Sequence, residues 1–291
     1  MQRGLFKYAL LAPGVAVVAA TLLYPLAQAL WFSLHDWNLG RQATLGPFVG
    51  LENFQLLFTD DPDFWHSAWV TLVFTAISTA ATLAVSLALA VLMAGSGPLE
   101  VNARTLLVIP FAMAPALIGV SWRFLLNPEF GAADAVLKTL VPPLRGTALL
   151  ADPIFAMAAM VFVDVWHWAP YFMLTFVGAM AALPSETLDA AEVDGAGKTR
   201  TFFEIILPQL RPVLLIAVLL KVIFSLKMLD QVITMTRGGP GTATSTLAYT
   251  IFEVAFRWFN MGYAAAMAYL LAAVMMLLAY VYSRMVLEKK A

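Results

Sequence analysis

The chain has 291 residues, of which 62% are hydrophobic and only 12% are charged. A soluble domain of average composition carries about 25% charged residues, so too few charges remain here to cover a water-facing surface. The composition therefore predicts a polytopic membrane protein. The formal net charge of -1 gives no reason to expect nucleic-acid binding. The absence of cysteine excludes disulfides, thiolate catalysis and cysteine-ligated metals.

Six segments are long and apolar enough to cross a bilayer, which takes about 20 mostly apolar residues per helix. They are residues 8–34, 66–94, 105–127, 154–182, 212–235 and 261–284. The first segment resembles a secretory signal up to Ala27-Gln28-Ala29, but its apolar run continues through Phe32 and exceeds the usual hydrophobic region. We expect it to remain as the first membrane helix, with removal as a signal peptide as the alternative. The sequence thus predicts an all-α membrane protein with a single transmembrane domain over residues 1–291.

Six spans place both termini on the same side of the membrane. More of the lysine and arginine residues flanking the predicted spans lie on the side of the termini than on the opposite side. This modest positive-inside bias favours cytoplasmic termini. It also predicts that the loop at 183–211, between spans four and five, is cytoplasmic.

That loop is charged, and it carries a short alanine- and glycine-bearing pattern between two long apolar runs. The pattern consists of Asp189, Ala190, Ala191, Glu192, Asp194 and Gly195, followed after nine residues by Ile205, Leu207 and Pro208. The two alanines keep a helix thin enough for another surface to approach, and the glycine can end that helix because it tolerates positive φ. We therefore expect a helix-turn-helix that projects into water and meets another protein.

The spacing of these residues resembles the signature loop of the membrane subunits of binding-protein-dependent ABC importers: Glu-Ala-Ala, three residues, Gly, nine residues, Ile-x-Leu-Pro. Asp189 departs from the pattern, which has Glu there. Further stretches are similar to the carbohydrate-importing branch of this family: Phe48-Val49-Gly50-Leu51-Glu52-Asn53-Phe54, Thr236-Arg237-Gly238-Gly239-Pro240 and Gly262-Tyr263-Ala264-Ala265-Ala266. The resemblance implies a permease subunit that translocates a sugar or related polyol by alternating access.

The same resemblance implies where the chain works and with which partners. It implies that the 183–211 loop couples this chain to an ATPase and that Gly238, Gly239 and Pro240 face the solute-binding protein. The implied partners are a second homologous permease, two ATP-binding subunits and an extracytoplasmic solute-binding protein, in the inner membrane of a bacterium or archaeon. No cofactor is expected in this chain, since ATP and Mg²⁺ would be bound by the partner ATPase.

Polar and aromatic residues inside spans four and five are candidates for the substrate pathway: Asp164, His167, Trp168, Lys227, Asp230 and Gln231. Ionisable groups inside a bilayer are costly and usually face a cavity or a partner. Sugar recognition needs aromatic faces and polar groups within a mostly apolar pocket. In the alternative interpretation, Lys227 and Asp230 only neutralise each other, Trp168 is an interface anchor and His167 is a packing residue. Lys221 and Lys227 would also suit an anionic substrate, but charge alone does not decide between ligands.

Two other functions are compatible with a polytopic chain. A stand-alone secondary carrier often shows inverted repeats with matching broken helices, and no such pairing is visible in the sequence. An intramembrane enzyme is poorly supported because the chain has three histidines and neither a Gly-x-Ser-x-Gly nor a His-Glu-x-x-His pattern. It also lacks a Gly-x-x-x-x-Gly-Lys-Ser/Thr phosphate loop. We therefore expect no catalytic and no metal-binding residues.

Overall fold

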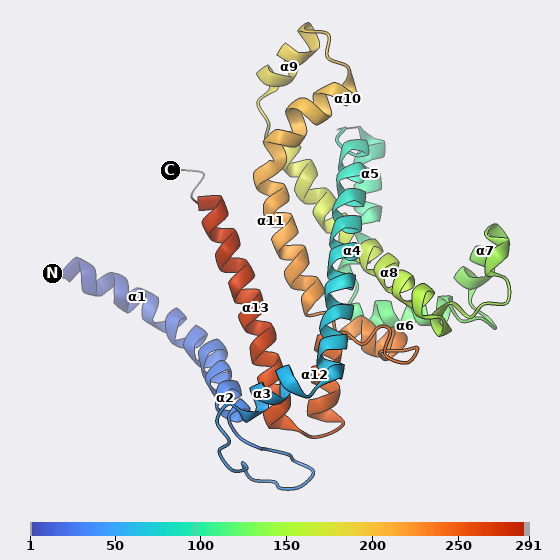
Figure 1. Cartoon of the computed structure of the whole chain (residues 1–291). Coiled ribbons are helices and arrows are strands. Elements are labelled where there is room, and N and C mark those ends of the chain that lie inside the picture. The colour runs from blue at the N-terminus through green and yellow to red at the C-terminus, as the bar shows by residue number, and fades with distance from the viewer. Residues whose placement is uncertain (1, 96, 288–291) are drawn as a thin grey trace. The chain divides into compact units, whose positions relative to one another are not determined.

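The computed structural model describes residues 2–95 and 97–287, with side chains described for residues 10–95 and 97–284. Within these ranges the regular structure is helical, apart from two isolated bridges that pair His35 with Phe48 and Asn38 with Asn260 (Figure 1). The predicted all-α membrane fold is confirmed. Five helices are long and apolar enough to cross a membrane, and a bent helix pair makes a sixth span if it is counted as one.

The chain divides into two compact units. The first holds the residues up to Trp65 together with Thr250–Leu277, and the second holds His66–Tyr249 together with the residues from Leu278. The helices of the first unit are α1 (Gln2–Val18), the π-helical segment Ala19–Leu23, α2 (Tyr24–Ser33), α3 (Glu52–Thr59) and most of α13 (Met261–Leu287). Like α13, the helices α4 (Pro62–Leu92) and α12 (Leu247–Phe256) contain residues of both units.

The remaining helices belong to the second unit. They are α5 (Pro98–Leu107), α6 (Pro115–Leu125), α7 (Ala132–Leu140), α8 (Pro153–Ala181), α9 (Ser185–Val193), α10 (Lys198–Thr201) and α11 (Leu207–Leu226). Short 3₁₀ turns occur at Ile109–Ala112, Pro142–Leu144 and Leu149–Ala151, and π-helical turns at Phe202–Ile206 and Val232–Thr236.

A glycine and an asparagine hold the turn after α2 in the first unit. The side-chain amide of Asn53 donates to the backbone carbonyls of Ser33 (2.9 Å) and His35 (3.0 Å). Gly262 lies so close to the His35 carbonyl that a Cβ at this position would collide with it. Two of the stretches that suggest the carbohydrate branch, around Asn53 and Gly262, thus meet at one turn of the backbone.

The third predicted span, 105–127, is not one helix. Its residues belong to α5, the 3₁₀ turn and α6, and the chain bends by 96° between Ala112 and Pro115. Proline restricts the preceding residue to extended backbone, and Ala114 has φ −64° and ψ 135°. The prolines at 110 and 115 therefore account for the break, and the expectation of one continuous helix is wrong.

The fifth predicted span, 212–235, differs at both ends. Its helical segment begins at Lys198, runs through the π turn and α11 without a break, and ends at Leu226. The π turn lies directly before Pro208, where a regular helix would have to absorb a missing N–H and a ring clash. Beyond Leu226 the chain leaves the helix at Lys227–Leu229, and the Met228 carbonyl accepts a hydrogen bond from the Thr246 hydroxyl (3.0 Å).

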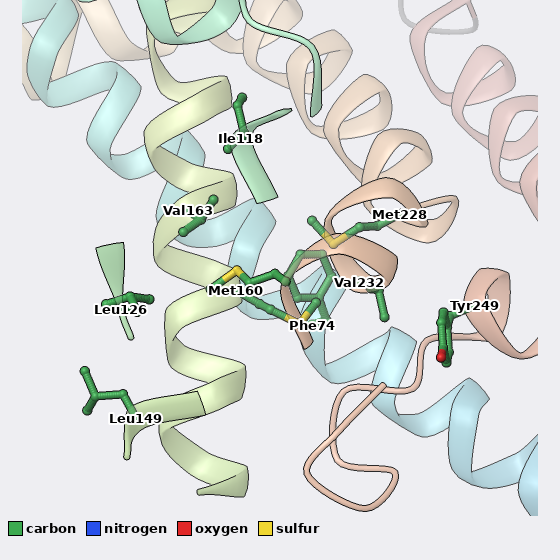
Figure 2. Close-up of a cluster of buried hydrophobic side chains, with 10 residues drawn as sticks. Phe74, Ile118, Leu126, Leu149, Met160, Val163, Met228, Val232 and Tyr249 are labelled. Carbon is green, nitrogen blue, oxygen red and sulfur yellow. The ribbon is translucent and has the colours of Figure 1, made fainter. Parts of the chain in front are cut away.

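The core of the second unit surrounds the N-terminal half of α8. Met160 and Val163 of α8 lie beside Phe74 of α4 and beside Val232 in the segment after α11 (Figure 2). These four side chains are fully buried. Because lipid is as apolar as these side chains, close van der Waals packing rather than exclusion from water stabilises their contact. A second apolar cluster around Phe172 packs α8 against α11. Between the two clusters lies the polar part of the unit.

Candidate functional site

A cavity of about 260 Å³ opens in the second unit, near the middle of α8. All six residues predicted for the substrate pathway line it. Its wall consists of Pro115, Asp164, His167, Trp168, Phe224, Lys227, Met228, Leu229, Asp230 and Gln231. The structure thus brings together side chains from α8 and from the segment after α11, which are about 60 residues apart in the sequence.

Two helix breaks create the cavity. Pro115 in its wall follows the bend before α6, and Lys227, Met228 and Leu229 in its wall form the break after α11. Gly119 of α6 lies against the Thr234 side chain and the Gln231 backbone, closely enough that a Cβ there would collide with the threonine. Broken helices in membranes are tolerated where the irregular backbone is buried or lines a cavity, as it does here.

One wall of the cavity is aromatic. The rings of Trp168 and Phe224 stack with centroids 4.4 Å apart and an interplanar angle of 16°. Phe111 and Tyr171 extend this cluster, with ring centroids 5.0 Å apart. Trp168 therefore forms part of an internal stack and lines the cavity, rather than serving only as an interface anchor.

A buried ion pair closes one side of the cavity. The Lys221 ammonium donates to Asp164 Oδ2 (2.6 Å), to the Ser225 hydroxyl (2.7 Å) and to the Ser78 hydroxyl (3.0 Å). The Ser78 hydroxyl in turn donates to the same Asp164 oxygen. The Lys221 and Asp164 side chains are 0% and 2% exposed, so this network joins α4, α8 and α11 in an apolar interior. Sequence reasoning missed Ser78, whose signal is a run of small hydroxyl residues along α4.

The alternative pairing of Lys227 with Asp230 does not occur. Both side chains are exposed and line the cavity, and no ion pair within 4.0 Å joins them among the described residues. The Lys227 ammonium instead lies 5.3 Å from the centroid of the Phe224 ring, a cation–π distance. Lys227 therefore faces the cavity without a carboxylate counterion.

Two buried polar side chains line the cavity with an unpaired atom each. His167 and Gln231 are each 3% exposed. His167 Nδ1 and Gln231 Oε1 have no hydrogen-bond partner among the described residues. Buried polar atoms are almost always paired with protein or water. These two atoms are therefore open to a ligand or a water molecule, although the His167 ring also packs against Phe111 and Trp168. Whether His167 binds substrate or is a packing residue stays a prediction.

The 183–211 loop forms the expected helix-turn-helix. Helices α9 and α10 project beyond the ends of α8 and α11 (Figure 1). Gly195 has φ +72°; its N–H donates to the Glu192 carbonyl (3.0 Å), and the Ala196 N–H donates to the Ala191 carbonyl (2.9 Å). These bonds form a Schellman motif, which commonly requires glycine.

The exposed face of this turn carries most of the signature. Asp189, Ala190, Glu192, Asp194 and Gly195 are exposed, whereas Ala191 is buried against its own unit. Val193, which sequence reasoning missed, is 87% exposed. Ile205 and Leu207 are half-buried and Pro208 is exposed, within the continuous helical segment that leads to α11.

The Gly-Gly-Pro loop is folded rather than open. The Thr244 hydroxyl donates to the Gly239 carbonyl (2.7 Å) and lies at hydrogen-bond distance from the Thr236 hydroxyl (2.8 Å). Gly238 has φ +79° and lies against the Tyr249 ring, where a Cβ would come within 2.7 Å of Tyr249 Cε1. The peptide bond before Pro240 is cis. The glycines thus allow the chain to form a compact turn. The contact of this loop with a binding protein stays a prediction.

These features define a class of protein: a helical membrane permease with a polar intramembrane cavity and a projecting helical loop. Residues 62–287 match the family described as binding-protein-dependent transport system inner membrane component. The chain belongs to this family. It is a transport subunit of an ABC importer, and ATP hydrolysis is carried out by a separate subunit.

Related proteins differ in the solutes that their names record. The sulfoquinovosyl glycerol transport system permease protein of Agrobacterium fabrum is 32% identical, over 96% of this chain and 90% of the relative. The trehalose/maltose transport system permease protein of Thermococcus litoralis is 31% identical, over 88% and 83%. A chain in the crystal structure of a bacterial alginate ABC transporter, in complex with a periplasmic protein, has the same fold, with a TM-score of 0.82 at 17% identity over 98% of this chain and 94% of that chain.

Proposed function

We propose that this chain is one of two homologous permease subunits of an ATP-driven importer for a sugar or related polyol. The observation that carries the proposal is the cavity: its aromatic stack offers faces for C–H surfaces, and its polar side chains offer partners for hydroxyl groups. The names of the two relatives above, which record a glycoside of a sulfonated sugar and two disaccharides, support this substrate class.

The 183–211 loop is the docking element for the ATPase in this proposal. Its exposed face is thin at Ala190, acidic at Asp189, Glu192 and Asp194, and apolar at Val193. The uninterrupted helical segment from Lys198 to Leu226 has 29 residues, or about 43 Å at 1.5 Å per residue. Since this segment ends at the cavity residue Lys227, a movement of the loop reaches the substrate site through one stiff element.

The remaining partners follow from the family. A second permease completes the pathway, two ATP-binding subunits bind ATP and Mg²⁺, and an extracytoplasmic solute-binding protein delivers the substrate. We infer cytoplasmic termini from the positive-inside bias, which places the 183–211 loop beside the ATPases. The compact loop around Gly238, Gly239 and Pro240 then faces the binding protein. The membrane is the inner membrane of a bacterium or archaeon.

Alternating access would use the two ends of this arrangement. ATP binding would close the ATPases and move the docked loops. The cavity would then open to the opposite side of the membrane. This chain contributes binding and motion and makes or breaks no covalent bond.

Affinity purification of the chain from native membranes in mild detergent, followed by reconstitution, tests the proposal. We expect an ATPase and a second six-span permease to co-purify, and the complex to accumulate a sugar or polyol in vesicles only with ATP and the binding protein. A chain that is recovered alone, stable and monodisperse, and that moves solute without ATP would instead be a stand-alone carrier.

A further inference from the structure

We propose that the substrate of this cavity carries an anionic group, such as a phosphate, sulfonate or carboxylate, and that Lys227 binds it. This inference rests on the proposed function, because it concerns the same cavity. It goes further by assigning the charge class of the substrate and the residue that selects it.

The argument begins with the distribution of charge around the cavity. Two basic and two acidic side chains lie at or beside its wall, and only one pair is formed. Asp164 receives the Lys221 ammonium and the Ser78 hydroxyl on a single oxygen, so its charge is already balanced. Lys227 has no carboxylate within 4.0 Å among the described residues.

The Lys227 side chain is exposed and lines the cavity, and ionisable groups that face a cavity within the membrane mark ligand or ion pathways. Asp230, three residues away and lining the same cavity, would be the simplest counterion, yet no ion pair within 4.0 Å joins the two side chains among the described residues. A ligand that brings an anion to Lys227 and a hydroxyl donor to Asp230 would satisfy both groups together. A neutral sugar would leave the ammonium without a counterion.

The surroundings of Lys227 suit a ligand that joins an anionic group to a sugar or polyol. Its ammonium lies over Phe224, and Phe224 stacks on Trp168, so the cation stands beside the aromatic wall that would receive the C–H face of a sugar. The distance from the ammonium to the Phe224 centroid, 5.3 Å, leaves its N–H groups free to donate to oxyanions.

Further hydrogen-bonding groups converge on the same space. Helix α6 begins at Pro115 in the cavity wall, and a helix N-terminus favours negative charge. A second observation points to a ligand there: within the part of the chain that the structure describes, the buried His167 Nδ1 and Gln231 Oε1 both lack hydrogen-bond partners. His167 Nδ1 donates or accepts according to its tautomer, so it suits an anionic oxygen or a hydroxyl of the ligand. Gln231 Oε1 only accepts, so it suits a hydroxyl.

The test is equilibrium binding to the assembled complex of permeases and ATPases in nanodiscs, without the solute-binding protein, whose own selectivity would mask that of the cavity. The probes are matched pairs that differ in charge: sulfoquinovosyl glycerol against glucosyl glycerol, and glycerol 3-phosphate against glycerol. The variants are Lys227→Met, which removes the charge, Lys227→Arg, which keeps it, and Asp230→Asn.

We expect the wild type to prefer the anionic member of at least one pair. Lys227→Met should weaken binding of that member by about tenfold or more, as expected for loss of a charge-assisted hydrogen bond, and leave the neutral member unchanged. Lys227→Arg should retain the preference, and Asp230→Asn should not abolish it. Equal binding of both members, binding of neither, or an anion preference that survives Lys227→Met would overturn the assignment. The proposed function fails separately, if the ATPases do not co-purify with the chain.

Discussion

Gly195 offers the sharpest test of the coupling loop, because its backbone conformation and its free space separate two possible effects of a side chain. Its φ is +72°, and a Cβ built there meets no atom within 4 Å. A threonine at this position would therefore not clash with the rest of the chain. Its cost would lie in the left-handed backbone conformation, which disfavours β-branched residues.

The expected magnitude follows from that conformation. An L-residue in the left-handed region costs about 1–2 kcal/mol relative to glycine, which lowers the ratio of formed to unformed turn by a factor of about 5–30. Leaving the conformation would break the two Schellman hydrogen bonds, from the N–H groups of Gly195 and Ala196. Gly195→Thr should therefore leave insertion into the membrane unchanged and lower substrate-stimulated ATP hydrolysis, with about 30-fold as the upper limit of the loss.

Gly197 provides the matched control. It also meets nothing within 4 Å, but it has φ −67° and ψ 159° and precedes the first turn of α10, where threonine is about as favourable as glycine. Substrate-stimulated ATPase activity of the reconstituted complex is the assay. Wild-type activity in Gly195→Thr, or an equal loss in Gly197→Thr, would refute the claim that the left-handed turn is what couples the loop to the ATPase.

Two further predictions concern stability. Lys221→Met removes the cation from a buried ion pair and should lower the stability of the detergent-solubilised chain by about 3–5 kcal/mol, as measured by thermal unfolding. Asp164→Asn on the same background should restore part of the loss. A Lys221→Met variant as stable as the wild type would contradict the pairing. Gly262→Val places a Cβ against the His35 carbonyl and should reduce the yield of folded protein in size-exclusion chromatography. Gly178→Val, in open space on α8, should not reduce it. Equal yields of the two variants would argue against the close approach of Gly262 to His35.

Local features of the sequence determined the class of the protein and much of its organisation. A low fraction of charge and long apolar runs suffice to predict membrane helices, because each helix satisfies its own backbone hydrogen bonds in lipid. The helix-turn-helix at 183–211 was also predictable, since a glycine at the end of a short helix encodes a turn through its own φ. The break before α6 could have been read from Pro110 and Pro115, because proline acts on its immediate neighbours.

The cavity depended on contacts that no local pattern contains. No proline or glycine lies at 227–229 to announce the break after α11. The Met228 carbonyl accepts its hydrogen bond there from the Thr246 hydroxyl, 18 residues further along the chain. The sequence placed Lys227 and Asp230 three residues apart, as a helical pair. The tertiary structure instead paired Asp164 with Lys221, 57 residues away, and left Lys227 facing the cavity. Which charges neutralise each other depends on side-chain distances after folding, and only the packing of α4, α8 and α11 decided those distances.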